Sequence, residues 1–263
     1  MRAYFSAFRM RLRLETQYRG AMIGGILCQL FFGIILVALY RALYAGRPQP
    51  IPIEHVTTYV WIQQSLFRML TSTDVDLYDK IRSGNISYDL CRPVSMYWFY
   101  YFRAAAQKLM GSFMRGAPMI AFAALLPKGW GITAPDSLPA FALSIAALFP
   151  GFLCMCALEN IAIGVTMRTL DPRGISGMLS LLMITFSGNL LPLTLFPDRW
   201  QAVIRWLPYS QLLDAPIRLY TGEYAPAEAV WIIPMQFLWA AVLIGLGMWL
   251  WDSNRKRLIV QGG

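Results

Sequence analysis

The chain is poor in charge and in the residue types from which catalytic sites are built. Of its 263 residues only 14% are charged and 57% are hydrophobic, and this balance excludes a single soluble domain. The sequence holds one histidine, His55, and it contains no phosphate-binding GxxxxGK[ST] loop, no HExxH zinc motif and no GxSxG nucleophile elbow. We therefore expect neither ATP binding in the usual way nor intramembrane serine or metal hydrolysis.

Cysteine is scarce as well, with four residues in the chain. Cys28, Cys154 and Cys156 lie in apolar stretches and Cys91 lies in a polar segment, so no disulfide framework is predicted. The Cys-Met-Cys pair has no histidine near it in the sequence to complete a metal site. We interpret these cysteines as small packing residues.

Long apolar stretches are what the sequence has in abundance. A helix needs about 20 residues to cross a hydrocarbon core of about 30 Å. The pattern predicts an all-α polytopic membrane protein, with one transmembrane domain over residues 1–263. The second stretch is the shortest and carries Gln63, Gln64 and Arg68, so we expect it inside the bundle. The six predicted spans are Ala21–Leu43, Val56–Leu70, Tyr97–Leu126, Leu138–Met167, Ile175–Leu195 and Ala229–Trp251.

Lysine and arginine are distributed unevenly over the loops. With the N-terminus inside, 13 of them lie in cytoplasmic pieces and six in outer pieces, so the positive-inside rule places both termini in the cytoplasm. The net charge of +9 reflects mostly this bias, and no separate basic face predicts nucleic-acid binding. Residues 1–19 predict a cytoplasmic amphipathic helix at the membrane surface, with arginines on one face and Ala3, Ala7 and Met10 on another. No cleavable signal peptide is predicted.

The segment 73–95 is a polar stretch between the second and third apolar runs. It cannot dissolve in lipid, so it must face water or another protein. Its acids Asp74, Asp76 and Asp79 leave one alternative open, a membrane transferase that holds Mg²⁺ on a diphosphate. Such enzymes generally need a second acidic motif, which the other cytoplasmic pieces lack. A solvated helix start is the simpler interpretation of these acids.

Ionisable residues within predicted spans are either functional or paired. Lys108 and Glu159 fall at similar depth when counted from the outer ends at about 1.5 Å per residue. We therefore predict that they approach one another, with Arg103 or Arg68 as the competing cation. The pair either fixes the helix register or takes part in transport. Arg115 lies near the middle of the third span.

The outer segment 196–225 is semi-apolar and rich in proline and tryptophan. It is too broken to span a membrane and too apolar to lie free in water. It predicts two short helices, Asp198–Leu207 and Gln211–Tyr220, which lie at the interface or re-enter part-way. The aromatic side chains expected at headgroup depth are Trp200, Trp206 and Tyr209.

Two passages are similar to the signature sequences of one transporter family. IRSGNISYDLCRPV, residues 81–94, resembles an I-R-x-G-x-(I/L)-x-x-x-L-x-(R/K)-P-V pattern, and residues 195–224 resemble an F-P…L-P-F…P…Y-x-G passage. Together with the six-span layout, they resemble the permease subunits of type-2 ATP-binding-cassette transporters over essentially the whole chain. The narrower resemblance is to a bacterial permease family first catalogued as a domain of unknown function, some members of which are linked to export of cationic compounds. Tyr209 stands where phenylalanine is more usual.

The resemblance implies a transport subunit that is not an enzyme and has no cofactor of its own, because ATP and Mg²⁺ are bound by a partner ATPase. The helix around Asp76–Ser87 would be the coupling helix, seated in a groove of that ATPase with Ile81 and Ile86 as anchors. The resemblance also implies export of drugs or lipids through the bacterial inner membrane, two ATPase copies, and a second permease as homodimer or sister subunit. The implied coupling residues are Asp76, Asp79, Lys80, Ile81, Arg82, Gly84, Asn85, Ile86, Arg92 and Pro93.

Two permeases would together enclose the translocation path, with membrane lipid around them. Trp200, Trp206 and Tyr209 would belong to an outer gate. An ion- or proton-coupled carrier or channel is the alternative function, but it predicts ionisable residues along several spans. The implied path residues, for which helix packing is an equal alternative, are Gln29, Gln63, Gln64, Ser187 and Asn189.

Overall fold

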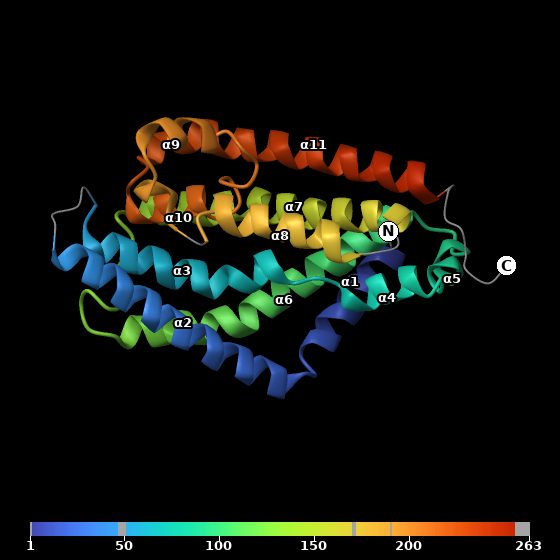
Figure 1. The fold of residues 1–263 in the computed structure, drawn as a ribbon, viewed down its shortest axis with the longest axis horizontal. Coiled ribbons are helices and arrows are strands. Elements are labelled where there is room, and N and C mark those ends of the chain that lie inside the picture. Colours follow the sequence, from blue (N-terminus) through green and yellow to red (C-terminus); the bar gives the residue numbers. More distant parts are fainter. Residues whose placement is uncertain (1, 47–50, 170–171, 190, 256–263) are drawn as a thin grey trace.

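The computed structural model describes residues 2–46, 51–169, 172–189 and 191–255, and over these ranges the chain is helical with no strand. Helices run nearly the whole length of an elongated bundle (Figure 1). The elements are α1 (Arg2–Glu15), α2 (Arg19–Ala45), α3 (Ile53–Thr71), α4 (Val75–Arg82), α5 (Ile86–Leu90), α6 (Met96–Leu125), α7 (Leu138–Thr169), α8 (Pro172–Phe186), η1 (Leu193–Leu195), α9 (Asp198–Ile204), α10 (Asp214–Thr221), η2 (Pro226–Glu228) and α11 (Ala229–Arg255).

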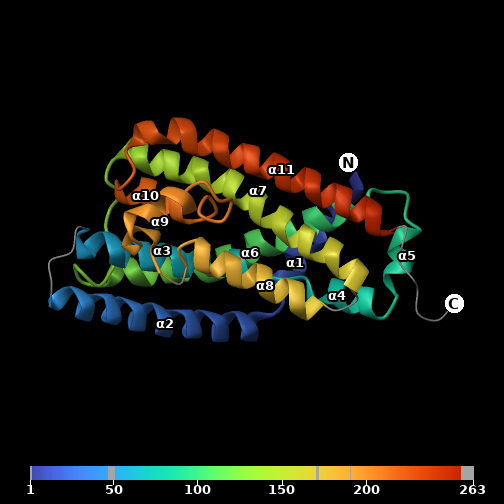
Figure 2. The same ribbon diagram turned by 45° about the horizontal axis from the view of Figure 1, so that its top comes forward.

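The bundle has a polar end and an aromatic end. Helices α4 and α5 lie at one end beside α1, and α9 and α10 lie at the other (Figure 1). In both views α2 and α11 form opposite edges of the molecule, with α3, α6, α7 and α8 between them (Figure 2). The packing is closest between α7 and α11, between α3 and α6, and between α1 and α6.

Three helical segments of the described chain are long and apolar enough to cross a membrane: Arg19–Ala45, Leu138–Thr169 and Pro226–Asn254. They correspond to the first, fourth and last of the predicted spans. Helices α3 and α6 match the second and third predicted spans in extent, but their interiors carry ionisable residues such as Arg68 and Lys108. That polarity sets α3 and α6 apart from the three apolar segments.

The fifth predicted span, Ile175–Leu195, is wrong as a continuous helix. Helix α8 ends at Phe186, and Gly188 follows with a φ of 79°, in the left-handed region that glycine adopts without strain. The chain then continues into η1, which begins after Pro192. At about 1.5 Å per residue, the 15 residues of α8 extend over roughly 22 Å, less than a hydrocarbon core.

The N-terminal helix is amphipathic, but its buried stripe differs from the predicted apolar face. Ala7 and Arg11 are buried, and α1 packs on α6. Met10, expected on the apolar face, is 59% exposed, and Ala3 is exposed too. The helix turns its arginine inward because α4 and α6 provide acidic and amide partners for Arg11.

The two outer helices exist but are shorter than predicted. Helix α9 ends at Ile204, and α10 begins only at Asp214, after a series of turns. Helix α10 packs on α7 and α3 and ends at Gly222, whose φ is 78°. A backbone bond from the Tyr224 N–H to the Arg218 carbonyl closes this end.

Candidate functional site

The polar loop 73–95 forms two short helices joined by a glycine turn. Helix α4 has Asp76 in its first turn and Lys80 and Arg82 in its last turn, an arrangement that suits the helix dipole. Gly84, with a φ of 76°, ends α4 in the left-handed conformation and lets the chain turn into α5. The G of the signature passage is therefore a backbone requirement.

The predicted role of Ile81 and Ile86 as anchors in a partner is wrong. Their side chains are 1% and 0% exposed and belong to the main hydrophobic core of this chain. Leu77 and Tyr78 share that buried stripe of α4, which packs on α7. The amphipathic spacing of α4 serves its own bundle, and an apolar residue in a polar loop cannot reveal from sequence which body it packs against.

Asp89 is the hub that holds α4 to α5 and α6. Its carboxylate lies 2.8 Å from the Lys80 ammonium and 3.1 Å from the Arg92 guanidinium, and it accepts a 2.6 Å hydrogen bond from the Tyr100 hydroxyl. Burial opposes ionisation of Asp89, but the hydrogen bonds from Lys80 and Tyr100, with the charges of Lys80 and Arg92, outweigh it and lower the pKa of the carboxyl. Lys80 and Arg92, expected to face a partner, are thus partly engaged within the loop.

The surface that the loop leaves open centres on Tyr88, which the sequence reasoning did not single out. Its side chain is 76% exposed, and no other large apolar side chain in the described part of 73–95 except Val75 is comparably open. A signal was present in the sequence, because an aromatic residue on a polar loop is typical of interface anchors. The exposed polar residues around it are Asp79, Arg82, Ser83, Asn85, Arg92 and Pro93.

The acids at the start of α4 are held by arginines. Asp74 is buried and lies 2.9 Å from Arg103 of α6 and 3.7 Å from Arg11 of α1, and Asp76 lies 3.0 Å from Arg11. Gln107 accepts a 2.8 Å bond from Arg11 and donates a 3.0 Å bond to the Thr73 carbonyl. Carboxylates neutralised in this way make the loop start a structural junction, which argues against a metal–diphosphate site.

The structure brings Lys108 and Glu159 together, as the sequence predicts, at 2.9 Å between ammonium and carboxylate. The side chains are 1% and 6% exposed. Lys108 also donates to the carbonyls of Met69 and Ser72, at 3.2 and 2.9 Å, and Glu159 accepts a 3.0 Å bond from the Asp74 N–H. This pair therefore ties the end of α3 and the start of α4 to α6 and α7. Of the competing cations, Arg103 goes to Asp74.

The predicted path residues lie in the interior of the single chain. Gln29 donates a 3.3 Å bond to the Gln64 carbonyl, which joins α2 to α3. Gln63 donates a 2.6 Å bond to the carbonyl of Gly188, the residue at which α8 has just ended. Ser187 and Asn189 are 0% and 7% exposed beside that break. These contacts are interhelical hydrogen bonds.

The outer segment has a buried charge cluster that sequence reasoning missed. Asp214 of α10 accepts a 2.7 Å bond from the Tyr59 hydroxyl of α3 and lies 3.8 Å from Arg218. Glu223 lies 3.4 Å from Arg218, and burial, opposed by the charge of Arg218 and assisted by that of Asp214, raises the pKa of Glu223 to about 7. Trp200 and Trp206 are 62% and 48% exposed, whereas Tyr209 is half-buried.

Comparison with known proteins gives one family. A sequence model described as ABC-2 family transporter protein matches residues 52–262 of the chain. The match takes in the polar loop 73–95, the buried Lys108–Glu159 pair and the outer segment. No curated protein matches the chain significantly.

Proposed function

Because the chain belongs to the ABC-2 family of transporter proteins, we propose that it is the membrane-spanning permease subunit of an ATP-driven exporter. It contains no phosphate-binding loop of its own, so separate ATPase subunits supply the energy through the loop 73–95. The observation that carries this proposal is the preformed, solvent-facing surface of α4 and α5, which is fastened at its back to the bundle.

The ATPase contacts this surface through Tyr88, with charged residues around it. A largely exposed aromatic ring fills a partner pocket at little conformational cost, and such residues carry much of an interface's energy. Asp79 and Arg82 are exposed on the same loop and make the rim contacts. The buried Ile81 and Ile86 keep the loop in shape from below.

Motion of the loop reaches the bundle through polar contacts. A displacement of α4 acts on Asp74, whose N–H is bonded to Glu159 and whose carboxylate is bonded to Arg103. Glu159 in turn holds Lys108, which holds the last carbonyls of α3. Buried charge-assisted bonds of this kind are strong and directional, so the loop and the ends of three helices move together.

In the membrane we place six crossings, by α2, α3, α6, α7, α8 with the turn after it, and α11, with both termini in the cytoplasm of a bacterium. Helix α8 is short and presents exposed apolar residues such as Met178 and Leu181. A second permease, as homodimer or sister subunit, covers this face and completes the path. Helices α9 and α10, with Trp200 and Trp206, cover its outer end as a gate.

The test is co-purification of the full-length chain from its own membranes. We expect an ATPase with a phosphate-binding loop to be retained, and Tyr88→Ala to weaken that retention about tenfold or more. Trp200→Ala is the matched control, because Trp200 is an exposed aromatic residue on α9 at the far end of the bundle. A wild-type chain that transports while carrying no such ATPase would refute the function. Full retention by Tyr88→Ala would refute the docking surface.

A further inference from the structure

A second polar site lies at the junction of α1 and α2, away from the docking surface. It is a cavity of about 240 Å³ between these helices, the end of α3, the start of α4 and the middle of α6. Three arginines and two acids are among the residues that line it: Arg11, Arg68, Arg115, Glu15 and Asp76. The cavity therefore has an excess of positive charge in its wall.

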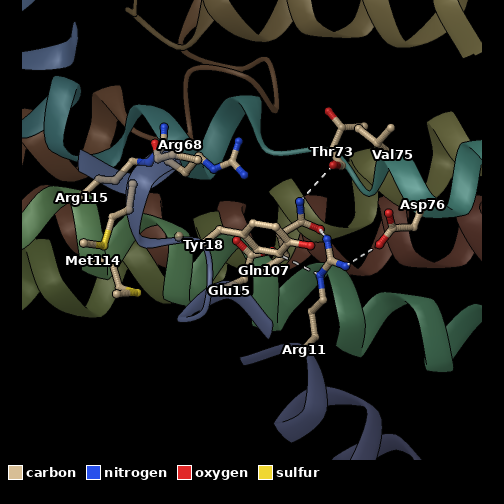
Figure 3. Close-up of a pocket in the computed structure, with 13 residues that line it drawn as sticks. Arg11, Glu15, Tyr18, Arg68, Thr73, Val75, Asp76, Gln107, Met114 and Arg115 are labelled. Atoms are coloured by element: carbon tan, nitrogen blue, oxygen red, sulfur yellow. Dashed lines mark hydrogen bonds and ion pairs between the residues drawn. The ribbon is translucent and has the colours of Figure 1, made fainter. Parts of the chain in front are cut away.

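That excess is concentrated at one end. Both acids belong to Arg11, which lies 3.3 Å from Glu15 and 3.0 Å from Asp76. Arg68 and Arg115 lie together at the opposite end of the cavity (Figure 3). Among the described residues no carboxylate lies within 4.0 Å of either guanidinium, and Arg115 donates a 3.3 Å bond to the Ala21 carbonyl. Two cations thus share a cavity without an anion of their own.

Two glycines keep these side chains in place. A side chain at Gly25 of α2 would overlap the Arg115 guanidinium. A Cβ at Gly111 of α6 would lie 3.1 Å from the Cγ of Arg68. The neighbouring helices therefore leave space in which the arginines lie flat between them, instead of extending into water. Like charges held side by side in this way repel each other unless an anion bridges them.

The surroundings indicate an anion that carries an apolar tail. The cavity opens beside the first turns of α2, the first of the three long apolar segments. The outward face of α2 exposes Ile23 and Leu27, at 54% and 62%, and α6 exposes Phe113 at 67%. Acyl chains can lie along this face while their headgroup reaches the cavity, and basic pockets between spans are typical headgroup sites.

We propose that Arg68 and Arg115 bind the phosphate group of a membrane phospholipid in this cavity. The planar guanidinium forks match phosphate oxygens in pairs of hydrogen bonds. The bound phosphate separates the two cations and joins α2, α3 and α6 at the level where α1 leaves the membrane. The inference requires α2 to lie in lipid, but it does not depend on the ATPase.

The experiment uses the full chain, delipidated in detergent, without any ATPase. Short-chain phosphatidylglycerol is titrated against it, and the thermal midpoint and bound lipid in native mass spectrometry are recorded. Dioctanoylglycerol, which lacks the phosphate, and inorganic phosphate, which lacks the tails, are the two comparison ligands. We expect phosphatidylglycerol alone to bind at micromolar concentration and raise the midpoint.

Arg68→Gln with Arg115→Gln should weaken phosphatidylglycerol binding about a hundredfold, roughly tenfold for each guanidinium–phosphate interaction that the variant removes. Arg13→Gln, an exposed arginine on α1 that does not line the cavity, should leave binding unchanged. If the glutamine variant folds poorly, Arg68→Lys with Arg115→Lys keeps both charges, removes the planar forks and should still weaken binding. Equal binding of dioctanoylglycerol, or unchanged binding by both double variants, would overturn the proposal. Equal stabilisation by inorganic phosphate would assign the site to a free anion and also overturn it.

Discussion

Replacing Glu159 with glutamine removes one charge from the buried pair and little else. The glutamine oxygen can still accept the 3.0 Å bond from the Asp74 N–H, so the change isolates the charge of the pair. The Lys108 ammonium then stays buried without its counter-ion. Breaking such a pair costs about 3–5 kcal/mol. Two carbonyls, at 3.2 and 2.9 Å, continue to hold Lys108, so we expect a loss near the lower limit, about 3 kcal/mol.

The assay is thermal unfolding of the purified chain in detergent. For a chain of this size, about 3 kcal/mol corresponds to a fall in Tm of roughly 6–12 °C. Glu54→Gln is the matched control, because Glu54 is exposed in the first turn of α3 and should leave Tm almost unchanged. Lys108→Met combined with Glu159→Gln leaves no uncompensated charge and should recover more than half of the loss.

Two results would refute this reasoning. One is a Glu159→Gln chain that unfolds at the wild-type Tm, which would mean that the ammonium is satisfied without the carboxylate. The other is a double variant whose loss equals the sum of the two single losses, because independent sites add and coupled sites do not. Activity measured on the same variants separates the two predicted roles of the pair, since a purely structural pair lowers Tm without changing transport per folded molecule.

Three further predictions concern the two ends of the bundle. Asp89→Asn should destabilise the chain by about 1–2 kcal/mol by weakening the bonds from Lys80 and Tyr100, seen as a lower Tm and faster proteolysis in 73–95; unchanged cleavage there would contradict it. Because the folded-state pKa of Glu223 is raised from 4.5 to about 7, stability is fully present below pH 4.5 and falls as pH rises to 7, by on the order of 3 kcal/mol. Glu223→Gln should flatten Tm against pH in this window, and an unchanged slope would refute the assignment. Gly222→Ala should cost about 1–2 kcal/mol, because its φ is 78° and the new Cβ would lie 2.7 Å from Asp136 Cγ, whereas Gly245→Ala, with open space around it, should lower Tm little or raise it, and equal losses would contradict the strain.

The sequence predicts the helical class and the extents of α2, α7 and α11 because their apolar runs are long and uninterrupted. It also predicts the Lys108–Glu159 contact, since equal depth on neighbouring helices leaves a buried charge few other partners. It fails where a single residue decides a local event. The end of α8 depends on the left-handed Gly188, and an apolar average over Ile175–Leu195 does not register one φ angle.

Contacts between distant segments were the second limit. The Tyr59 hydroxyl meets Asp214 across 155 positions of sequence, and nothing in either neighbourhood indicates the other. The same holds for Ile81 and Ile86, whose apolar character fits a partner's groove and this chain's own core equally well. Side-chain pattern states what must be covered, whereas the covering body is set by the packing of the whole bundle.

Helix α3 is fastened near both of its ends, by Tyr59 to the outer segment and by its last carbonyls to Lys108. About 15 Å of continuous helix separates Tyr59 from Met69. A helix is stiff along its axis, so α3 acts as a connecting rod between the two faces of the membrane. A stroke of a few ångströms applied at one face either arrives at the other or breaks a bond, and the two mouths of the molecule cannot open independently.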